Sequence, residues 1–331
     1  HPEYGMDHRL LLDKVDFEAG TIELENKSFP LKDTYLPSIY SGDPYALSNA
    51  ETDLMEKLHL AFLHSAKLQE HVRFLFARGS MYKICNSFLL YHGCIPMEED
   101  GSFSKINIHG KAYSGKALLD GAEAMARQGY FSKQGSPEKA EGLDAMWYLW
   151  CGKKSPLFGK NRMATFERYL IGDPSTWEEQ KDPYYSMLHQ ESTAVSILKE
   201  FGLPPENSHI VNGHVPVKLC KGESPIKAGG KLFVIDGGLS RAYQSVTGIA
   251  GYTLIDKSIG LFLACHEPFE SVATAIENEV DIHSSHEIIE RAKKRKLVAD
   301  TDDGIEIKER INDLRALLQA FRSGSIKEHH V

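Results

Sequence analysis

Cysteine is scarce in this sequence, and its spacing forms no recognisable framework. The chain carries five cysteines, Cys85, Cys94, Cys151, Cys220 and Cys265. Their number is odd, and no two of them form a C-x-x-C pair. Disulfide scaffolds and cysteine zinc sites both need closely spaced, paired cysteines. The pattern therefore argues against both classes and leads us to expect a protein of the reducing cytoplasm.

Long apolar runs and an excess of positive charge are also absent. No stretch approaches the about 18–20 consecutive apolar residues that a membrane span needs. The net charge is −8, whereas a protein that binds nucleic acid non-specifically is normally basic. We therefore expect neither a membrane nor a nucleic acid as a partner. Any phosphorylated ligand must be held by a local group of cations or by metal ions.

The first residues lack two further features. His1 to Gly5 do not show the basic stretch followed by an apolar one that marks a signal peptide. Position 1 is also not the initiator methionine. We therefore expect this chain to be part of a longer protein.

Apolar spacing and capping signals predict a mixture of helices and strands. Residues 48–51, Ser-Asn-Ala-Glu, form a capping box, and apolar side chains at helical spacing follow them as far as Gly79. This predicts one long helix over about 49–78 with one apolar face. A second helix is expected over about 190–201. Strands are expected over about 10–17, 21–24, 88–92, 210–211, 232–236, 252–255 and 259–264.

Two histidines stand just after predicted strands. His92 ends the apolar run 88–91, and His214 follows Ile210-Val211 and Asn212-Gly213. Ligands of α/β sheets bind beyond the carboxyl ends of the strands, and imidazole is the commonest metal ligand in proteins. A glycine beside each histidine lets the backbone approach an ion or a phosphate closely. The pair is a candidate metal site, although a hydrogen-bonded structural histidine fits each position taken alone.

The segments around these histidines resemble motifs of a known superfamily. Residues 89–96, LLYHGCIP, resemble the HGG strand-end motif of calcineurin-like metallophosphoesterases, and residues 210–217, IVNGHVPV, resemble their GHTPV motif. A closer similarity is to the bacterial class III fructose-1,6-bisphosphatases, and it runs in order over about residues 9–266. It is carried by the segments 147–152, 156–160, 165–169, 235–245 and 247–254.

The resemblance implies a fold and two metal ligands. In that superfamily the two histidines bind one metal of a binuclear centre, so His92 and His214 are expected to be metal ligands. The implied fold is α/β, part of a two-sheet metallophosphoesterase sandwich flanked by helices, with a helical cap insertion. The expected parts are 1–97 (strands and long helix of the core), 98–190 (helical cap), 191–266 (second part of the core) and 267–331 (charged C-terminal helices).

The other metal motifs of the superfamily are missing. D-x-H, G-D-x-x-D-R and G-N-H do not occur in the sequence, and chains of the family are about twice as long, with those motifs in the N-terminal half. We therefore expect this chain to be the C-terminal half. The remaining metal ligands and the catalytic residues are expected on the N-terminal half, which would be its partner.

The resemblance also implies a reaction. It is hydrolysis of the 1-phosphate of D-fructose 1,6-bisphosphate to fructose 6-phosphate and phosphate, a step of gluconeogenesis. Two divalent ions about 3.5–4 Å apart clamp the attacking and leaving oxygens in such sites. Imidazole and carboxylate ligands together suit Mn²⁺, so a binuclear manganese centre is expected. A homo-oligomer is compatible with this reading.

The second phosphate of that substrate needs cations, because the net charge of the chain opposes its binding. The candidates for sugar-phosphate contacts are Arg241, Tyr243 and Lys218, followed by Lys160, Arg162 and Arg168. An ordinary surface residue or a structural ion pair fits each cation as well. Asp236 and Asn212 are candidates for orienting a metal-binding histidine, and a role in the turn at Gly237-Gly238 fits Asp236 at least as well.

Two other functions stay open. One is a related metallophosphoesterase that acts on a phosphoprotein or a dinucleotide; the similarity in the cap favours the sugar bisphosphatase over it. The other is a non-catalytic regulatory or assembly module, and the missing metal motifs favour that one.

Overall fold

The computed structural model describes the chain except for residues 109, 237–239, 249–250, 268–270, 280–283 and 327–331. The chain divides into two compact units, His1–Tyr82 with His92–Leu188 and Lys83–Tyr91 with His189–Val331. This division differs from the four parts predicted from the sequence. Residues 1–82 group with the predicted helical cap, and only the short segment Lys83–Tyr91 groups with the later strands. Both units mix helices and strands, so the expected α/β class is confirmed.

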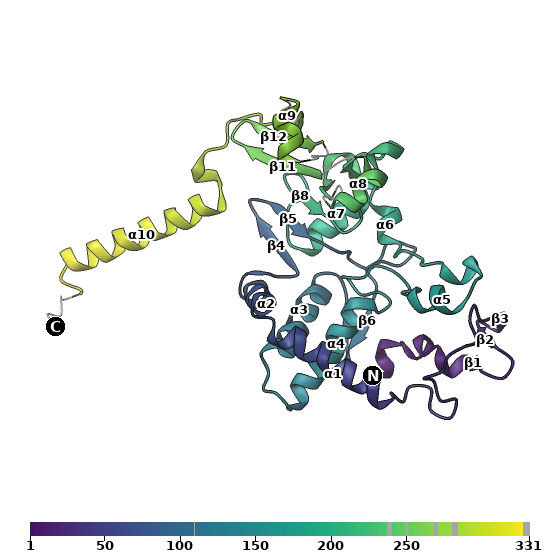
Figure 1. Cartoon of the computed structure of the whole chain (residues 1–331). Helices are drawn as coiled ribbons and strands as arrows, with labels where there is room; N and C mark the ends of the chain where they lie inside the picture. Colours follow the sequence, from purple (N-terminus) through teal and green to yellow (C-terminus); the bar gives the residue numbers. More distant parts are fainter. Residues whose placement is uncertain (109, 237–239, 249–250, 268–270, 280–283, 327–331) are drawn as a thin grey trace. The chain divides into compact units, whose positions relative to one another are not determined.

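The described residues of the first unit form two small antiparallel sheets and six α-helices. β1 (Val15–Asp16), β2 (Thr21–Leu24) and β3 (Lys27–Pro30) form one sheet, and β6 (Ile106–Ile108) pairs with β7 (Lys111–Tyr113). The helices, labelled in Figure 1, are α1 (Asn49–His64), α2 (Ala66–Arg78), α3 (Gly115–Phe131), α4 (Pro137–Cys151), α5 (Thr165–Leu170) and α6 (Tyr184–Met187). The 3₁₀ helices of this unit are η1 (Pro2–Tyr4), η2 (Asp7–Arg9), η3 (Leu12–Lys14) and η4 (Pro174–Trp177).

Helices α3 and α4 pack closely and contribute most of one hydrophobic core. Their backbones meet at two glycines: a Cβ on Gly142 would lie 2.2 Å from the backbone nitrogen of Gly129. Leu118 and Leu149 are fully buried beside this crossing. Tyr4 stacks on Tyr148 of α4 with 4.7 Å between the ring centroids. The first residues of the chain therefore complete the core of the two helices.

The predicted long helix is two helices. The capping box is confirmed, because the Ser48 hydroxyl accepts from the Glu51 N–H at 3.3 Å and the Glu51 carboxylate accepts from the Ser48 N–H at 2.8 Å. At Ser65, however, the backbone is extended (φ −70°, ψ 98°), and the hydroxyl accepts from the N–H of Leu68. Ser65 therefore caps a new helix. No residue of α1 or α2 is buried.

The first predicted strand is largely wrong, whereas the second is confirmed as β2. Leu12–Lys14 forms η3, and only Val15–Asp16 pairs with β2. The Asp16 carboxylate accepts from the N–H groups of Glu18 and Ala19 at 3.0 and 2.9 Å. This local turn ends β1 early, since it uses donors that a longer strand would have offered to its neighbour.

The second unit contains a five-stranded sheet. The strand order is β4 (Tyr82–Cys85), β5 (Phe88–Tyr91), β8 (His209–Asn212), β10 (Leu232–Val234) and β9 (Ile226–Lys227). β5, β8 and β10 are parallel neighbours, and β9 runs antiparallel to β10. β8 and β10 are almost wholly buried, as expected for strands covered on both faces. The predicted helix before them is α7 (Glu191–Glu200).

A three-stranded antiparallel sheet follows in the same unit. β11 (Gly251–Lys257) and β12 (Gly260–His266) form the predicted hairpin. β13 (Ser284–Arg291) pairs with β12 on the other side, although helices alone were expected after residue 266. Its sequence, SSHEIIER, belongs to an edge strand that is mostly exposed, so its polar composition conceals it.

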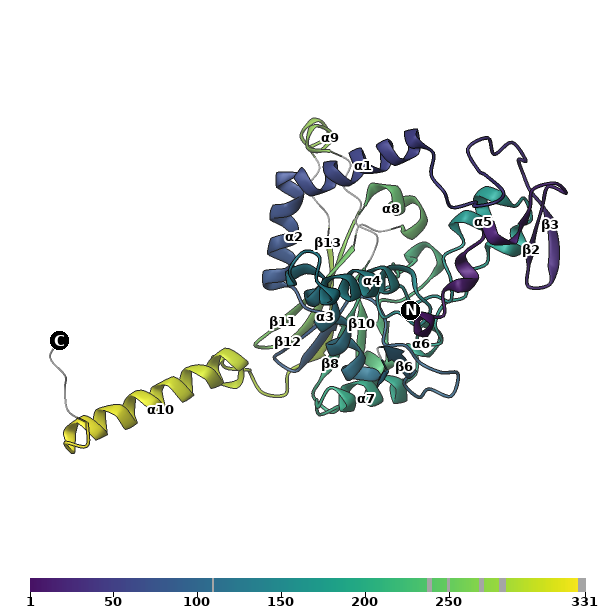
Figure 2. The same cartoon turned by 90° about the horizontal axis from the view of Figure 1, so that it is seen from below.

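Other α-helices described in the second unit are α8 (Arg241–Thr247), α9 (Val272–Glu277) and α10 (Asp302–Arg322), and its described 3₁₀ helices are η5 (Leu219–Lys221), η6 (Ala228–Gly230) and η7 (Val298–Asp300). Figure 2 shows them from below. None of the helices in the described part of the chain has the length and apolar character needed to cross a membrane.

A half-buried histidine at the start of β8 leads us to expect a stability that depends on pH. His209 lies 5.4 Å from the ring of Phe88 and 5.7 Å from that of Phe233, between centroids. Its Nδ1 lies 3.1 Å from the carbonyl oxygen of Gly230. Burial lowers the pKa of His209 below its ordinary value of 6.5. The unfolded chain therefore binds a proton at this position at a higher pH than the folded chain does.

We expect the free energy of unfolding to fall as the pH drops through about 6.5, because protonation then favours the unfolded state. In His209→Gln, which cannot be protonated, the loss between pH 7.5 and pH 5.5 should be smaller than in the parent. Urea unfolding at both pH values measures the difference. Equal losses in the two proteins would show that His209 is not responsible.

Candidate functional site

Three parallel strands end side by side at one edge of the five-stranded sheet. β5 pairs with β8 through Leu90 and Val211, and β8 pairs in turn with β10. Just beyond these strand ends the chain reaches His92 after β5, His214 after β8 and Asp236 after β10. Parallel strands share one carboxyl edge, so the topology brings the three positions to the edge where α/β sheets bind ligands.

Hydrogen bonds connect the segments beyond these strand ends. The buried side chain of Asn212 donates from Nδ2 to the carbonyl oxygen of Tyr91 at 3.2 Å. The backbone N–H of Val217 donates to the carbonyl oxygen of Asp236 at 2.8 Å. The first bond joins β8 to the residue before His92, and the second joins the loop after β8 to the end of β10. That Asn212 or Asp236 also orients a histidine ring stays a prediction.

His214 has an unusual backbone conformation. Its φ is 71°, in the left-handed region, which histidine enters more readily than β-branched or bulky residues do. Residues held in sparsely populated backbone regions concentrate at functional sites. The side chain is half-buried, whereas His92 is exposed.

Gly93 fixes the backbone directly after His92. A Cβ at this position would lie 1.9 Å from the carbonyl oxygen of Pro156, far inside van der Waals contact. That same carbonyl accepts from the N–H of Cys94 at 2.8 Å. Only glycine permits this approach, so Gly93 lets the segment after His92 pack against the loop that contains Pro156 within the first unit.

The donor set for a metal is incomplete among the described residues. Within the described residues, no three His, Cys, Asp or Glu side chains come together as a group that could hold a metal ion. Two imidazoles at one sheet edge suit a divalent transition metal, but a binuclear centre needs more ligands than these. The described residues therefore fit part of such a centre and not the whole of it.

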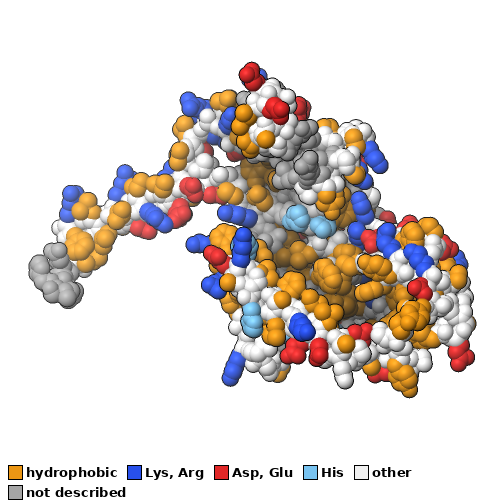
Figure 3. Space-filling view, viewed as in Figure 1, with side chains coloured by type: hydrophobic (Ala, Val, Ile, Leu, Met, Phe, Trp, Pro, Cys, Tyr) orange, Lys and Arg blue, Asp and Glu red, His pale blue; other side chains and the backbone are white. Residues whose placement is uncertain are grey.

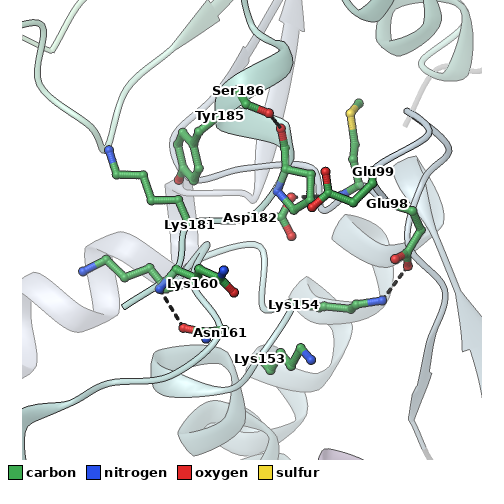
Figure 4. A pocket seen from close by; sticks show the side chains of 13 residues that line it. Glu98, Glu99, Lys153, Lys154, Lys160, Asn161, Lys181, Asp182, Tyr185 and Ser186 are labelled. Atoms are coloured by element: carbon green, nitrogen blue, oxygen red, sulfur yellow. Dashed lines mark hydrogen bonds and ion pairs between the residues drawn. The ribbon is translucent and has the colours of Figure 1, made fainter. Parts of the chain in front are cut away.

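A separate pocket lies wholly within the first unit. Its volume is about 690 Å³, and segments 97–99, 153–154, 160–161, 180–183 and 185–186 line it. Figure 4 shows the lining side chains. Its charged side chains are four lysines and three carboxylates: Lys153, Lys154, Lys160, Lys181, Glu98, Glu99 and Asp182. Cations predominate slightly here, although the chain as a whole carries net negative charge.

Two of these lysines are engaged in ion pairs. Lys154 Nζ lies 2.5 Å from Glu98 Oε1, a pair drawn as a dashed line in Figure 4. Lys160 Nζ lies 2.6 Å from Glu179 Oε2. The Lys153 side chain is exposed at the same pocket, and no hydrogen bond or ion pair of its ammonium is seen with the described residues.

The six predicted sugar-phosphate residues are divided between the two units, three in each. Lys160 lines the pocket, but Arg162 and Arg168 do not. Arg162 pairs with Glu25 at 3.1 Å, and Arg168 donates to the carbonyl oxygen of Trp177 at 3.1 Å. These two arginines have intramolecular partners, as the alternative interpretation allowed.

The other three residues belong to the second unit. The backbone N–H of Lys218 donates to Glu223 at 3.0 Å, and Tyr243 is 58% exposed on α8. Arg241 begins α8, and its side chain lies outside the described residues. A role in substrate binding stays a prediction for all of them.

Sequence reasoning missed most of the pocket. Lys153, Lys154 and Lys181 were not singled out, and neither were Asn161 and Tyr185. The tandem Lys153-Lys154 was a visible signal in the sequence, because it directly follows Gly152, which ends α4. Lys181 lines the pocket only because segments distant in the sequence come together. No local sequence pattern indicates such a contact.

Asp182 holds two segments of the pocket wall together. It is a buried carboxylate, and its Oδ1 accepts from the N–H groups of Met97 and Tyr184, both at 3.0 Å. Burial raises the pKa of Asp182 above its ordinary value. The pocket therefore depends on an acceptor at this position more than on a charge.

We expect Asp182→Ala to lower the free energy of unfolding by about 2–4 kcal/mol, because it leaves two buried N–H groups without an acceptor. Asp182→Asn keeps one acceptor oxygen and removes the buried charge, so it should stay within about 1 kcal/mol of the parent. Urea unfolding of both variants at pH 7 tests this. Equal destabilisation by the two changes would show that the charge itself is needed.

A comparison with protein families now adds a decisive match. Residues 1–323 match the family described as Firmicute fructose-1,6-bisphosphatase. The chain belongs to this family. Curated relatives named fructose-1,6-bisphosphatase class 3 agree with the match. The protein of Clostridium novyi is 55% identical over 328 residues, and that of Alkaliphilus metalliredigens is 55% identical over 329 residues.

These alignments cover nearly all of this chain but only about half of each relative's own length. The relative from Clostridioides difficile is 54% identical over 99% of this chain but over only 50% of its own length. For the Clostridium novyi protein the covered share is 49%. The chain thus spans about half the length of the curated relatives it matches. No solved structure matches it.

Proposed function

We propose that this chain is the C-terminal half of a metal-dependent fructose-1,6-bisphosphatase. The family match over residues 1–323 is the observation that carries the proposal. In the proposed reaction water adds to the phosphorus of the 1-phosphate, the bond from phosphorus to the sugar oxygen breaks, and that oxygen leaves with a proton. The products are fructose 6-phosphate and inorganic phosphate. A place in gluconeogenesis and in the cytoplasm follows from this activity.

We propose that the metal centre takes its ligands from both halves of the protein. His92 and His214 provide two ligands from adjacent strand ends, and the remaining ligands and catalytic groups lie on the N-terminal half. The incomplete donor set within the described residues supports this division. A binuclear centre of divalent ions, most suitably Mn²⁺ with nitrogen and oxygen ligands, would supply electrostatic stabilisation of the transferring phosphoryl group.

The lysine-lined pocket of the first unit is our candidate for the second phosphate of the sugar. Its four lysines offer positive charge, and Asn161 beside them offers an amide group for a sugar hydroxyl. Lys153 has its ammonium available, whereas Lys160 would exchange its contact with Glu179 for a phosphate oxygen. A pocket of about 690 Å³ is large enough for a sugar phosphate.

We expect Lys153→Ala to raise KM for fructose 1,6-bisphosphate about tenfold with kcat little changed, since a hydrogen bond to a charged group contributes about 1.5–3 kcal/mol. Lys133→Ala, an exposed lysine of the same unit that does not line the pocket, serves as the matched control. Initial rates at varied substrate measure both. An unchanged KM in Lys153→Ala would remove this pocket from the proposal.

The function itself is tested with a completed enzyme, by which we mean this chain joined to the half that it lacks. The part of the Clostridium novyi relative that this chain does not match is joined ahead of residues 1–331, and phosphate release from fructose 1,6-bisphosphate is followed with Mn²⁺ and then with chelator. We expect chelator-sensitive release by the joined protein and none by the chain alone. A folded joined protein that releases no phosphate would overturn the proposal. Full activity of the chain alone would overturn the assignment of the missing ligands to another half.

A non-catalytic role is the second candidate, and the incomplete metal donor set of the described residues favours it. In that case the joined protein stays inactive on every phosphate ester offered. Activity on a phosphoprotein or a dinucleoside polyphosphate, but not on the sugar bisphosphate, would instead indicate a related metallophosphoesterase.

A further inference from the structure

Helix α10 is long, exposed and almost without tertiary contacts. It has 21 residues, all of them described, and Gly304 is its one buried residue. Its main packing neighbour within the described part of its unit is η7 (Val298–Asp300). In Figures 1 and 2 it extends away from the strands of its own unit. Helices in water gain most of their stability from packing an apolar face, so α10 lacks the contact that would stabilise it.

One face of α10 carries a regular apolar stripe. The spacing is four, three, four and three residues, which is the a/d pattern of a two-stranded coiled coil. Each of these side chains is between 41% and 64% exposed. The stripe, which we call the α10 seam, consists of Ile307, Ile311, Leu314, Leu318 and Phe321.

One flank of the α10 seam is wholly cationic. With Ile311 at an a position, the e positions are Lys308, Arg315 and Arg322. Lys308 donates to the carbonyl oxygen of Ala299, and no hydrogen bond or ion pair of the Arg315 and Arg322 side chains is seen with the described residues. Charges at e and g decide which helix pairs with a coiled-coil stripe.

Pairing of α10 with a second copy of itself places like charges together in either direction, which an acid-flanked helix would not do. In a parallel pair each g residue faces an e residue of the partner, which sets Arg310 against Arg315 but also sets Asp303 against Lys308. In an antiparallel pair e faces e, which sets Lys308 against Arg315. Like charges at these positions repel, so a second copy is not the occupant that the α10 seam selects.

The charge of the whole helix disfavours an anionic membrane surface. Five acidic residues accompany four basic ones in α10, so the helix is not a cationic amphipath of the membrane-binding kind. Most of the acids lie on the face opposite the seam, where they would approach the lipid last but would lower the overall attraction. Figure 3 shows apolar, basic and acidic side chains exposed side by side along this helix. The acidic residues are Asp302, Asp303, Glu306, Glu309 and Asp313.

We propose that α10 pairs through its seam with an amphipathic helix of another polypeptide segment whose own apolar stripe is flanked by Asp and Glu. The two helices form a short coiled coil in which Arg315 and Arg322 face carboxylates. The pairing is independent of the phosphatase reaction, because neither α10 nor its flank contains a residue of the proposed site.

A pair of synthetic helices of about four heptads tests this. Both have Ile at a and Leu at d, and they differ only in carrying Glu or Lys at every e and g position. Fluorescence anisotropy measures the Kd of each labelled peptide for the full chain. We expect the Glu peptide to bind at least about tenfold more tightly than the Lys peptide, and added salt to reduce the difference.

Variants of the chain make the test specific. Arg315→Glu together with Arg322→Glu should reverse the preference in favour of the Lys peptide, and Leu314→Gln should weaken both. Glu309→Gln, on the opposite face, is the matched control and should change neither Kd. Unaltered circular dichroism of the variants establishes that α10 is still formed.

Three results would overturn the proposal. The first is equal binding of both peptides, or binding of neither. The second is a concentration-dependent dimer in sedimentation that Leu314→Gln abolishes, because a second copy would then occupy the seam. The third is binding of the chain to anionic phosphatidylserine vesicles that Leu314→Gln abolishes.

Discussion

Replacement of either strand-end histidine should abolish the activity of the completed enzyme. We expect His92→Ala to lower Mn²⁺-dependent phosphate release about 100-fold or more, because even residues that only support a metal ligand cost about 10–100-fold when they are removed. His71→Ala, an exposed histidine of α2, is the matched control and should keep full activity. Initial rates at saturating Mn²⁺ measure the effect, and a His92→Ala enzyme with normal activity would contradict the assignment.

Two substitutions of His214 distinguish the loss of a metal ligand from the effect of its backbone conformation on stability. Its left-handed φ of 71° is strained for alanine by about 1 kcal/mol but is readily adopted by glycine. His214→Gly should therefore unfold at a higher urea concentration than His214→Ala, while both lose activity to the same extent. If activity followed stability instead, the histidine would have a structural role only.

Removal of Arg9 should produce the largest loss of stability in the first unit. Arg9 Nη1 and Nη2 contact the two carboxylate oxygens of Glu167 at 2.5 and 2.9 Å, and Nη2 also donates to the carbonyl oxygen of Met163 at 2.6 Å. The Glu167 side chain is only 1% exposed. Arg9→Ala would leave this carboxylate buried without its counter-ion, at a cost of about 3–5 kcal/mol.

A double variant distinguishes loss of the ion pair from loss of packing. Arg9→Met with Glu167→Leu replaces both charges by apolar groups of similar size, and such replacements are often neutral in buried pairs. We therefore expect the double variant to be more stable in urea than Arg9→Ala. A double variant as unstable as Arg9→Ala would mean that the contact with Met163 or the packing of the guanidinium stem matters more than the pair.

A helix or strand could be predicted wherever the residues of that one element show a characteristic apolar pattern. β5, β8 and β10 are short apolar runs, and α7 has helical apolar spacing before a glycine, so all four could be located from the sequence. β13 could not, because an exposed edge strand has no reason to be apolar. The break at Ser65 could not either, since a serine inside a helical pattern is also compatible with an unbroken helix.

The site could be predicted only in part, for a similar reason. The strand-end position of His92 and His214 is a local feature, and the parallel pairing of β5 with β8 places the ends of these two strands at one edge. The lysine-lined pocket is assembled from segments as far apart as residues 97 and 186. Arg162, in contrast, pairs with Glu25 in a distant strand turn, and no pattern within 160–168 indicated that partner.

Binding of Mn²⁺ to the completed enzyme tests the central claim most directly. The claim is that this chain contributes two metal ligands, His92 and His214, to a centre completed by residues outside it. Electron paramagnetic resonance of free Mn²⁺ gives the affinity without reliance on turnover. We predict that His92→Ala and His214→Gly each weaken Mn²⁺ binding at least about tenfold, whereas His71→Ala does not. Unchanged Mn²⁺ affinity in both site variants would contradict the account.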